Sequence, residues 1–271
     1  MPIKPNKTKI AKRVLEVLEF FDENTRQATC MDIARRYGRP QSSTSELLSS
    51  LTEMGFLYKD SRSRSYSLTP RVALLGCLAQ PDTLKSGRLI PMMDRLSAKT
   101  GCGVALTGVV GTHVQMFGWV AGGETEPSFF GGASDALSCS VAGQLLLSTL
   151  PREQCAGLLR RLNAEAAPEQ RFHGAAMLEQ IEDFGRQRYA IGASGFSADM
   201  HMCAALLPHQ AGERPLAIAI VYAPSRRLDP DVLLDRLLAA ISDFAAEGKV
   251  PPAPVASNDG WAPLPGVAAA V

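Results

Sequence analysis

The sequence predicts an α+β protein with two domains joined by a helix. Its 271 residues allow two domains of about 100–200 residues each, and a hydrophobic content of 46% is ordinary for a globular chain. In residues 83–248, helical and strand periodicities mix without the regular β-α alternation of a parallel fold. We therefore expect domains at 1–69 and 83–248, a linker helix at 70–82, and a disordered, Pro- and Ala-rich tail at 249–271.

Charge is distributed unevenly along the chain. The net charge is +1, but residues 1–75 hold 13 Lys and Arg against 8 Asp and Glu, a net of +5. The remaining 15 basic and 19 acidic residues give a net of −4. A basic N-terminal part is the expected footprint of a nucleic-acid-binding domain. The arm at 1–8 carries lysines that either follow DNA phosphates or are simply solvated.

The cysteines and the N-terminus exclude several classes of protein. Six Cys, at positions 30, 77, 102, 139, 155 and 203, form no C-x-x-C pair and have no His at metal-ligand spacing. We therefore expect reduced thiols, no metal and no cofactor. The N-terminus lacks the apolar core of a signal peptide, and no stretch reaches the roughly 18 apolar residues of a membrane helix. A cytoplasmic protein without a membrane partner follows.

The segment 29–68 has the pattern of a winged helix-turn-helix. Thr29 can cap a helix over 30–37, and Gly38, which tolerates a positive φ, can end it. Pro40 then fits a turn, with Ser42 or Ser43 as the cap of a second helix. Apolar residues recur at helical spacing in both helices: Met31, Ile33, Ala34 and Tyr37 in the first, Leu47, Leu48, Leu51 and Met54 in the second.

Two short strands, 56–59 and 65–68, flank a polar connection and predict a wing that carries two arginines. In such a motif the second helix enters the major groove with its N-terminal residues facing base edges. The alternative is a small helical domain with a solvated hairpin, in which the leucines are ordinary core. On the first reading, the expected DNA contacts are Arg39, Gln41, Ser42, Ser43, Thr44, Ser45, Arg62 and Arg64.

The remaining elements follow from periodicity and from Gly and Pro positions. An amphipathic helix over 9–21 buttresses the motif, and a helix over 71–80 has an apolar stripe that suits packing against its twin in a dimer. Pro91 demands a kink or an early break in the next helix. We expect further helices at 84–100, 141–149, 151–161, 177–188 and 229–247, and strands at 104–110, 113–120, 189–191, 202–207 and 216–222.

These features resemble the IclR family of bacterial transcriptional regulators over about residues 9–247. The resemblance rests on RVLEVL at 13–18, IARRYG at 33–38, GFL at 55–57, YSL at 66–68 and LSCSVAGQLL at 137–146. It implies a winged helix-turn-helix joined by a helix to an effector-binding domain of GAF-like topology, in a homodimer or homotetramer. The chain departs from the family at Glu46 and Gln144, where basic residues are usual, at Ser138, where His is common, and at His201.

The resemblance also implies an effector pocket. A helix start with two serines suits a small carboxylate, and aromatic residues beside glycines suit an aromatic acid. For Cys203, Ala205 and Met116 individually, ordinary core is the favoured interpretation. The implied effector-binding residues are Met116, Phe117, Trp119, Phe129, Phe130, Ser138, Cys139, Ser140, Val141, Ala142, Gly143, Cys203 and Ala205.

No catalytic constellation is visible in the sequence. The four His are scattered, and neither a G-x-S-x-G turn nor a paired-carboxylate motif is present. Asp199, His201 and Cys203 alternate on one strand face, a pattern that more often serves local packing. We therefore predict a non-enzymatic repressor or activator that binds a double-stranded operator, with a small metabolite modulating its affinity. The alternative is a ligand-binding or protein-interaction module with a vestigial winged helix, favoured by acidic Glu46.

Overall fold

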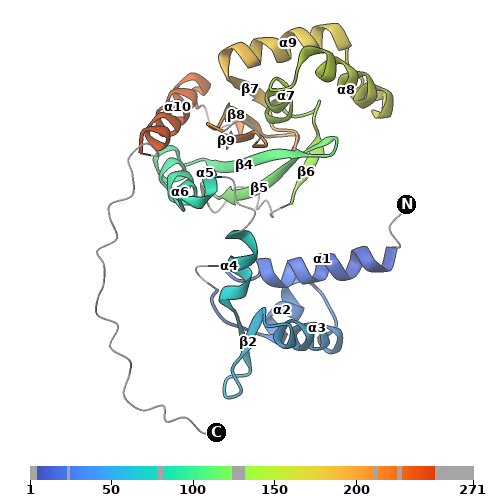
Figure 1. Cartoon of the computed structure of the whole chain (residues 1–271), viewed down its shortest axis with the longest axis vertical. Helices are drawn as coiled ribbons and strands as arrows, with labels where there is room; N and C mark the ends of the chain where they lie inside the picture. The colour runs from blue at the N-terminus through green and yellow to red at the C-terminus, as the bar shows by residue number, and fades with distance from the viewer. Residues whose placement is uncertain are drawn as a thin grey trace.

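The computed structural model describes residues 5–22, 25–77, 82–123, 132–209, 213–224 and 228–247. They form an N-terminal helical domain with a small sheet and a C-terminal domain built around a six-stranded sheet, with helix α4 (Pro70–Cys77) between them (Figure 1). Three predicted segments lie wholly or partly outside the described residues: the loop with Phe129 and Phe130, the second half of the linker, and the tail.

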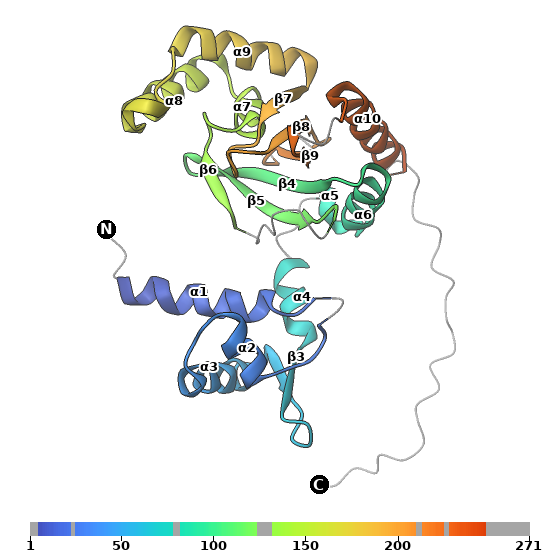
Figure 2. The same ribbon diagram turned by 180° about the vertical axis from the view of Figure 1, so that it is seen from behind.

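The N-terminal domain packs three helices on a three-stranded sheet (Figure 2). A strand that we did not expect, β1, pairs antiparallel with β3 and makes the wing part of a larger sheet. Val17, Ile33, Leu48, Leu51 and Leu57 form the buried core. The elements are α1 (Pro5–Glu19), β1 (Ala28–Thr29), α2 (Cys30–Arg36), α3 (Gln41–Glu53), β2 (Leu57–Lys59) and β3 (Ser65–Leu68).

The helix predicted over 84–100, with a kink or an early break at Pro91, is two separate helices. The chain forms α5 (Asp82–Lys85) and α6 (Leu89–Thr100), separated by a turn in which Gly87 has a φ of 65°. Pro91 therefore sits in the first turn of α6, where its missing N–H breaks no helical hydrogen bond. Gly101, with a φ of 65°, ends α6 as expected. Four apolar side chains of α6 are buried as predicted: Leu89, Met92, Met93 and Leu96.

The C-terminal sheet has the order β6-β5-β4-β9-β8-β7, and every neighbouring pair is antiparallel. The long hairpin of β4 and β5 was expected, whereas the edge strand β6 was not. Strands β4 and β9 lie at the centre and are almost wholly buried. The bounds are β4 (Gly103–Val110), β5 (His113–Val120), β6 (Ser134–Ala136), β7 (Tyr189–Ala193), β8 (His201–Leu206) and β9 (Leu216–Tyr222).

Helices cover both faces of this sheet (Figures 1 and 2). One face packs against α7 (Val141–Leu147), with α8 (Arg152–Glu165), the 3-10 turn η1 (Pro168–Gln170) and α9 (Gly174–Gln187) outside it. The other face packs against α6 and α10 (Pro230–Glu247). We call these the α7 face and the α10 face. Within the described residues, no helix has the length and apolar character needed to cross a membrane.

Candidate DNA-binding interface and effector site

The first helix of the predicted motif is fixed at both ends by local chemistry. Thr29 caps α2: its Oγ1 accepts a hydrogen bond from Asp32 N, and its own backbone N donates to Asp32 Oδ2 at 2.9 Å. Hydrogen bonds from the Thr29 side chain and then its backbone lower the pKa of Asp32. At the other end, Gly38 takes a φ of 59° and turns the chain toward α3. The helix-turn-helix geometry therefore follows from this capping box and one glycine.

Helix α3 begins earlier than we expected. Pro40 occupies the cap position in an extended conformation and Gln41 is the first helical residue, so the prediction of a Ser42 or Ser43 cap is wrong. The hydroxyls of Ser43 and Thr44 instead donate to the carbonyl of Pro40, at 3.2 and 2.9 Å. The hydroxyl protons of Ser43 and Thr44, two residues predicted to contact bases, are therefore already engaged in hydrogen bonds within the helix.

Helical periodicity divides α3 into a buried side and an exposed side. Thr44, at 2% exposure, lies on the buried side with Leu48 and Leu51 and cannot reach a base edge, which corrects its assignment. Two methionines predicted to be buried, Met31 and Met54, are 46% and 48% exposed. The exposed side carries what we call the reading face: Gln41, Ser42, Ser45 and Glu46.

The wing is a tight turn stabilised by an aspartate. Asp60 Oδ1 accepts from the backbone N of Arg62 at 2.7 Å and of Ser63 at 3.3 Å, which lowers the pKa of Asp60. Arg64 adopts a φ of 54°, in the left-handed region. Arg62 and Arg64 are both exposed, and neither forms an ion pair among the described residues. The turn therefore presents two uncompensated cations beside the reading face.

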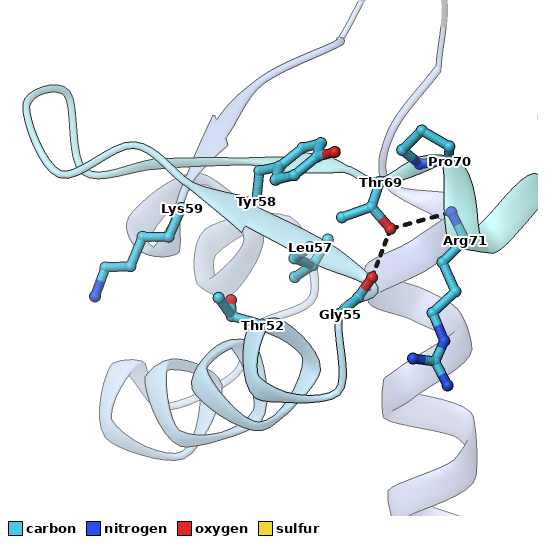
Figure 3. Close-up of a pocket in the computed structure, with 8 residues that line it drawn as sticks. All are labelled: Thr52, Gly55, Leu57, Tyr58, Lys59, Thr69, Pro70 and Arg71. Atoms are coloured by element: carbon cyan, nitrogen blue, oxygen red, sulfur yellow. Dashed lines mark hydrogen bonds between the residues drawn. The ribbon is translucent and has the colours of Figure 1, made fainter. Parts of the chain in front are cut away.

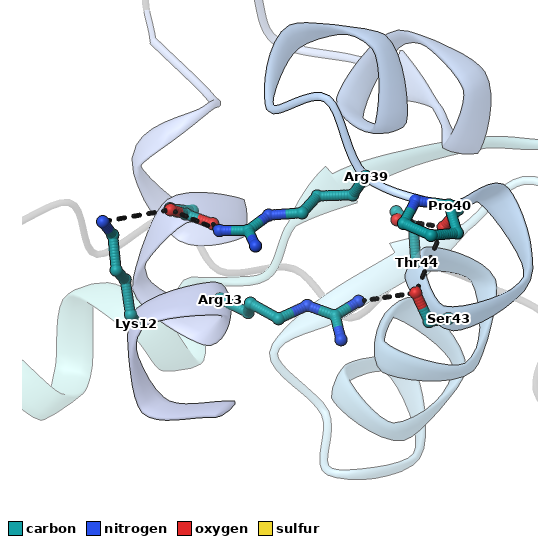
Figure 4. A network of polar contacts seen from close by, with 7 residues as sticks. Lys12, Arg13, Arg39, Pro40, Ser43 and Thr44 are labelled. Carbon is teal, nitrogen blue, oxygen red and sulfur yellow. Dashed lines mark hydrogen bonds and ion pairs between the residues drawn. The ribbon is translucent and has the colours of Figure 1, made fainter. Parts of the chain in front are cut away.

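Helix α1 contacts the start of α3 through charged side chains (Figure 4). Arg39, which we expected to contact DNA, donates from Nη2 to both carboxylate oxygens of Glu16, at 3.0 and 3.1 Å. Lys12 lies 3.9 Å from the same carboxylate. Arg13, which the sequence did not single out, donates from Nη2 to Ser43 Oγ at 3.1 Å. The spacing R-x-x-E places Arg13 and Glu16 on one face of α1, but it does not indicate a contact with Ser43.

Helix α4 continues directly from the sheet of the N-terminal domain. Thr69 Oγ1 donates to the carbonyl of Gly55 at 2.6 Å and accepts from Arg71 N at 3.2 Å (Figure 3). The Arg71 guanidinium lies 5.0 Å from the ring centre of Phe56. A cavity of about 590 Å³ opens at this junction. These contacts join the start of the linker to the DNA-binding domain.

In the C-terminal domain, a bulge in β5 sorts the predicted effector residues onto two faces. Leu106 pairs with Gly118 and Thr107 with Met116, which leaves Phe117 as the extra residue. Met116 and Trp119 consequently pack on the α7 face. Phe117 is 48% exposed and lies over Gly108, on the side away from α7.

The segment 138–143 lies on the α7 face with Met116 and Trp119. Cys203 and Ala205 belong to the core of the α10 face, because alternate residues of β8 point to opposite sides of the sheet. They cannot line one pocket with the start of α7, and this part of the prediction is corrected. Ser138, Cys139, Ser140, Val141, Ala142, Gly143, Met116 and Trp119 remain together, while Phe129 and Phe130 lie outside the described residues.

Two polar atoms at the start of α7 are buried without a partner. Ser140 occupies the cap position of α7, but its side chain makes no capping bond. Ser140 Oγ and Gln144 Oε1 have no hydrogen-bond partner among the residues that the structure describes, although the residues are only 0% and 7% exposed. Gln144 Nε2 donates to the carbonyl of Ser138 at 2.8 Å, which fixes the orientation of the amide. Such atoms are costly unless a ligand or water pairs with them.

Asp135 and Gly195 were missed at this site. A Cβ added at Gly195, where φ is 80°, would lie 2.7 Å from Asp135 Oδ2 and 2.8 Å from Ser140 Cβ. Burial and then the Asp135 charge raise the pKa of Cys139. A cavity of about 430 Å³ in this domain lies at the opposite end of α7, between Leu150, Leu158 and Arg214. Sequence spacing gave no signal for Gly195, because its loop is far along the chain from Asp135 and Ser140.

Comparison with known proteins identifies the N-terminal domain and shows the fold of the whole chain. The IclR helix-turn-helix domain model matches residues 11–61. An IclR transcriptional regulator from Alicyclobacillus acidocaldarius aligns with a TM-score of 0.57 at 20% identity, over 91% of this chain and 98% of that one. Residues 11–61 are thus an IclR-type helix-turn-helix domain, and the chain as a whole has the fold of these regulators. The predicted fold class and family resemblance are thereby confirmed.

Further solved structures extend the likeness of this IclR-type chain. The Thermotoga maritima IclR aligns with a TM-score of 0.56 at 16% identity, over 89% of this chain and 97% of that one. An IclR homolog from Microbacterium hydrocarbonoxydans, complexed with 4-hydroxybenzoate, aligns with a TM-score of 0.57 at 16% identity, over 88% and 98% of the two chains. No curated protein sequence matches the chain.

Proposed function

We propose that this IclR-type regulator binds its operator as a dimer or higher oligomer through the reading face and the wing. The observation that carries the proposal is the exposed polar side of α3, flanked by the uncompensated cations Arg62 and Arg64. Phosphate contacts from the wing would position the domain, and the reading face would select the sequence. The vestigial-module alternative is not favoured, because these groups are exposed and available.

Exposed apolar residues on two adjacent helices support self-association. Leu74 and Leu75 of α4 are 63% and 60% exposed, and Ile10 and Leu15 of α1 are 58% and 56% exposed. The C-terminal end of α1 lies beside α4 in both views (Figures 1 and 2). Large apolar side chains exposed on neighbouring helices favour an interaction site over a solvated face. A second copy is the partner that a palindromic operator requires.

We propose a small aromatic acid or other carboxylate as effector, bound between α7 and the Trp119 side of the sheet. The Microbacterium homolog complexed with 4-hydroxybenzoate supports this class of ligand. Ser140 Oγ and Gln144 Oε1 can accept from a ligand hydroxyl, which relieves their burial cost. Since the Thr69 and Arg71 contacts tie α4 to the reading head, a ligand that prefers one dimer geometry would shift operator affinity by about 1–3 kcal/mol.

We also propose that the protein acts by binding alone, in the cytoplasm. The polar cluster considered for catalysis does not suit it: Cys203 is fully buried, and burial raises the pKa of its thiol to about 12. A thiol held neutral at physiological pH is a poor nucleophile. Asp199 lies in an exposed turn before the strand that carries His201.

Selection of bound sequences from a random DNA pool tests the proposal. Purified full-length protein is used at near-physiological salt, and the survivors are sequenced with and without 4-hydroxybenzoate. An enriched palindrome is expected, and its half-site spacing reports the separation of the two reading heads. A folded, dimeric protein that enriches no sequence under either condition would overturn the regulator proposal.

A further inference from the structure

Arg13 places an uncompensated positive charge beside the first turn of the reading helix. Its side chain is partly buried and reaches across from α1 to α3, where Nη2 donates to Ser43 Oγ (Figure 4). Among the described residues it forms no ion pair. A guanidinium has five N–H donors, and this contact uses one. The remaining donors can bind a phosphate while Nη2 holds Ser43.

Arg39 is in the opposite situation. Its Nη2 is bound to both oxygens of Glu16, a carboxylate whose side chain is only 16% exposed and which also attracts Lys12. Arg39 Nε is buried without a hydrogen-bond partner. The side chain therefore runs from the turn back toward α1, away from the exposed side of α3 (Figure 4). Its charge is largely neutralised where it lies.

We propose that Arg13, and not Arg39, binds the DNA backbone phosphate beside the reading helix. The Glu16–Arg39 pair is a positioning device: it fixes α1 on the turn, so that the guanidinium one turn of helix from Glu16 reaches Ser43. The inference rests on the proposed operator binding. It gives Arg13 the DNA contact that the sequence suggested for Arg39.

Ser43 supplies the geometric reason. Its hydroxyl proton is directed at the Pro40 carbonyl, so its oxygen is left to accept from Arg13. The Arg13 guanidinium is thus held, before any DNA is present, at the N-terminal end of α3, which enters the major groove in the proposed complex. Pre-organisation of this kind lowers the entropy lost when the phosphate binds. Because phosphates carry no sequence information, the contact contributes affinity and orientation but no base preference.

The test measures affinity against salt concentration for four variants of the full chain: Arg13→Ala, Arg13→Lys, Arg39→Ala and Lys12→Ala. Each is titrated with the selected operator and with unrelated DNA. Lys12→Ala is the matched control, because it removes the same charge from the adjacent position of the same helix. Far-UV circular dichroism and the melting temperature report whether α1 and the domain are intact.

We expect Arg13→Ala to weaken binding to both DNAs by the same factor and to reduce the slope of log K against log salt by about 1. Arg13→Lys should restore the slope but only part of the affinity, since it lacks the fork. Arg39→Ala should lower the melting temperature and leave the slope unchanged. A slope lost in Arg39→Ala and kept in Arg13→Ala would overturn the inference, as would an equal loss in Lys12→Ala. Wild-type protein that binds no DNA would instead overturn the proposed function itself.

Discussion

Met116 and Trp119 face the same side of the sheet although they are three positions apart along β5. Simple alternation would place them on opposite faces. The extra residue Phe117 changes the parity of the strand, so that both side chains pack toward α7. The indole of Trp119 then covers Gly103 on the neighbouring strand, where a side chain would overlap the ring. The bulge thus places an aromatic surface opposite the start of α7.

Gly103→Ala should therefore destabilise the C-terminal domain. The added methyl overlaps the Trp119 ring, and overpacking of this kind costs about 1–3 kcal/mol. Urea denaturation measures the free energy of unfolding, and near-UV circular dichroism reports the displaced indole. Gly157→Ala on α8 is the control: nothing lies within 4 Å of the added methyl, and helix propensity predicts a neutral or slightly stabilising change. Equal effects of the two substitutions would contradict the packing argument.

Ser140→Ala separates a binding role from a structural one. The Ser140 hydroxyl is fully buried and unpaired, so its removal should leave the melting temperature unchanged or raise it slightly. If the effector binds there, the same variant should lose part of the melting-temperature increase that 4-hydroxybenzoate or a related acid produces. Thermal shift assays with and without ligand measure both quantities. A strongly destabilised Ser140→Ala protein would show that its hydroxyl is satisfied within the fold.

The capping box of α2 predicts a pH-dependent stability of the DNA-binding domain. Thr29 lowers the pKa of folded Asp32 below that of the unfolded chain, so the stabilisation is complete above the unfolded pKa, near 4, and is lost as the pH falls through the folded pKa. Thr29→Val removes the side-chain bonds and should cost about 1 kcal/mol at pH 7. Thr29→Ser should keep them. Urea midpoints at pH 7 and pH 3 are expected to show the Thr29→Val deficit shrinking in acid.

The wing turn can be tested without changing charge between the variants. Asp60→Asn and Asp60→Ala both remove one negative charge, but only Asn keeps an oxygen that can accept from Arg62 N and Ser63 N. We expect Asp60→Asn to bind DNA at least as tightly as the wild type and Asp60→Ala to bind several-fold more weakly than Asp60→Asn. Fluorescence anisotropy with operator DNA measures the difference. Indistinguishable affinities would remove the ordered wing from the binding model.

Local chemistry made the N-terminal domain predictable, whereas long-range contacts did not show in the sequence. Thr29, Gly38 and the spacing of Leu48 and Leu51 act within one turn or one helix, so their patterns carry the structure. The misassignment of Thr44 had a local cause: Thr44 lies four and seven residues before Leu48 and Leu51, so helical periodicity places it on the same buried face. The contact of Arg13 with Ser43 joins two helices, and no period in the sequence encodes it.

The contrast between local patterns and long-range contacts also explains which effector-site residues were assigned correctly. The segment 137–146 was identified by its resemblance, and its position at α7 follows from a helix that is buried on every side. Cys203 and Ala205 were assigned wrongly because a motif gives no strand register, and one residue decides which face a side chain takes. The single-residue bulge at Phe117 has the same effect in β5. The face on which a strand residue lies could therefore be assigned only once the pairing of the strands was known.

Self-association through α4 is the last prediction. Leu74 and Leu75 are more exposed than the other large hydrophobic residues of the described chain, and burying a leucine contributes about 1.5–3 kcal/mol. Leu74→Ser with Leu75→Ser should therefore raise the dimer dissociation constant by at least tenfold, since each 1.4 kcal/mol is a factor of ten. Sedimentation velocity measures the mass, and Ile90→Ser, at a 51% exposed site on α6, is the control. An unchanged mass in the double variant would place the dimer contact elsewhere. If α4 does join the two copies, the variant should also lose more affinity for a palindrome than for a half-site, because only the palindrome gains from two linked reading heads.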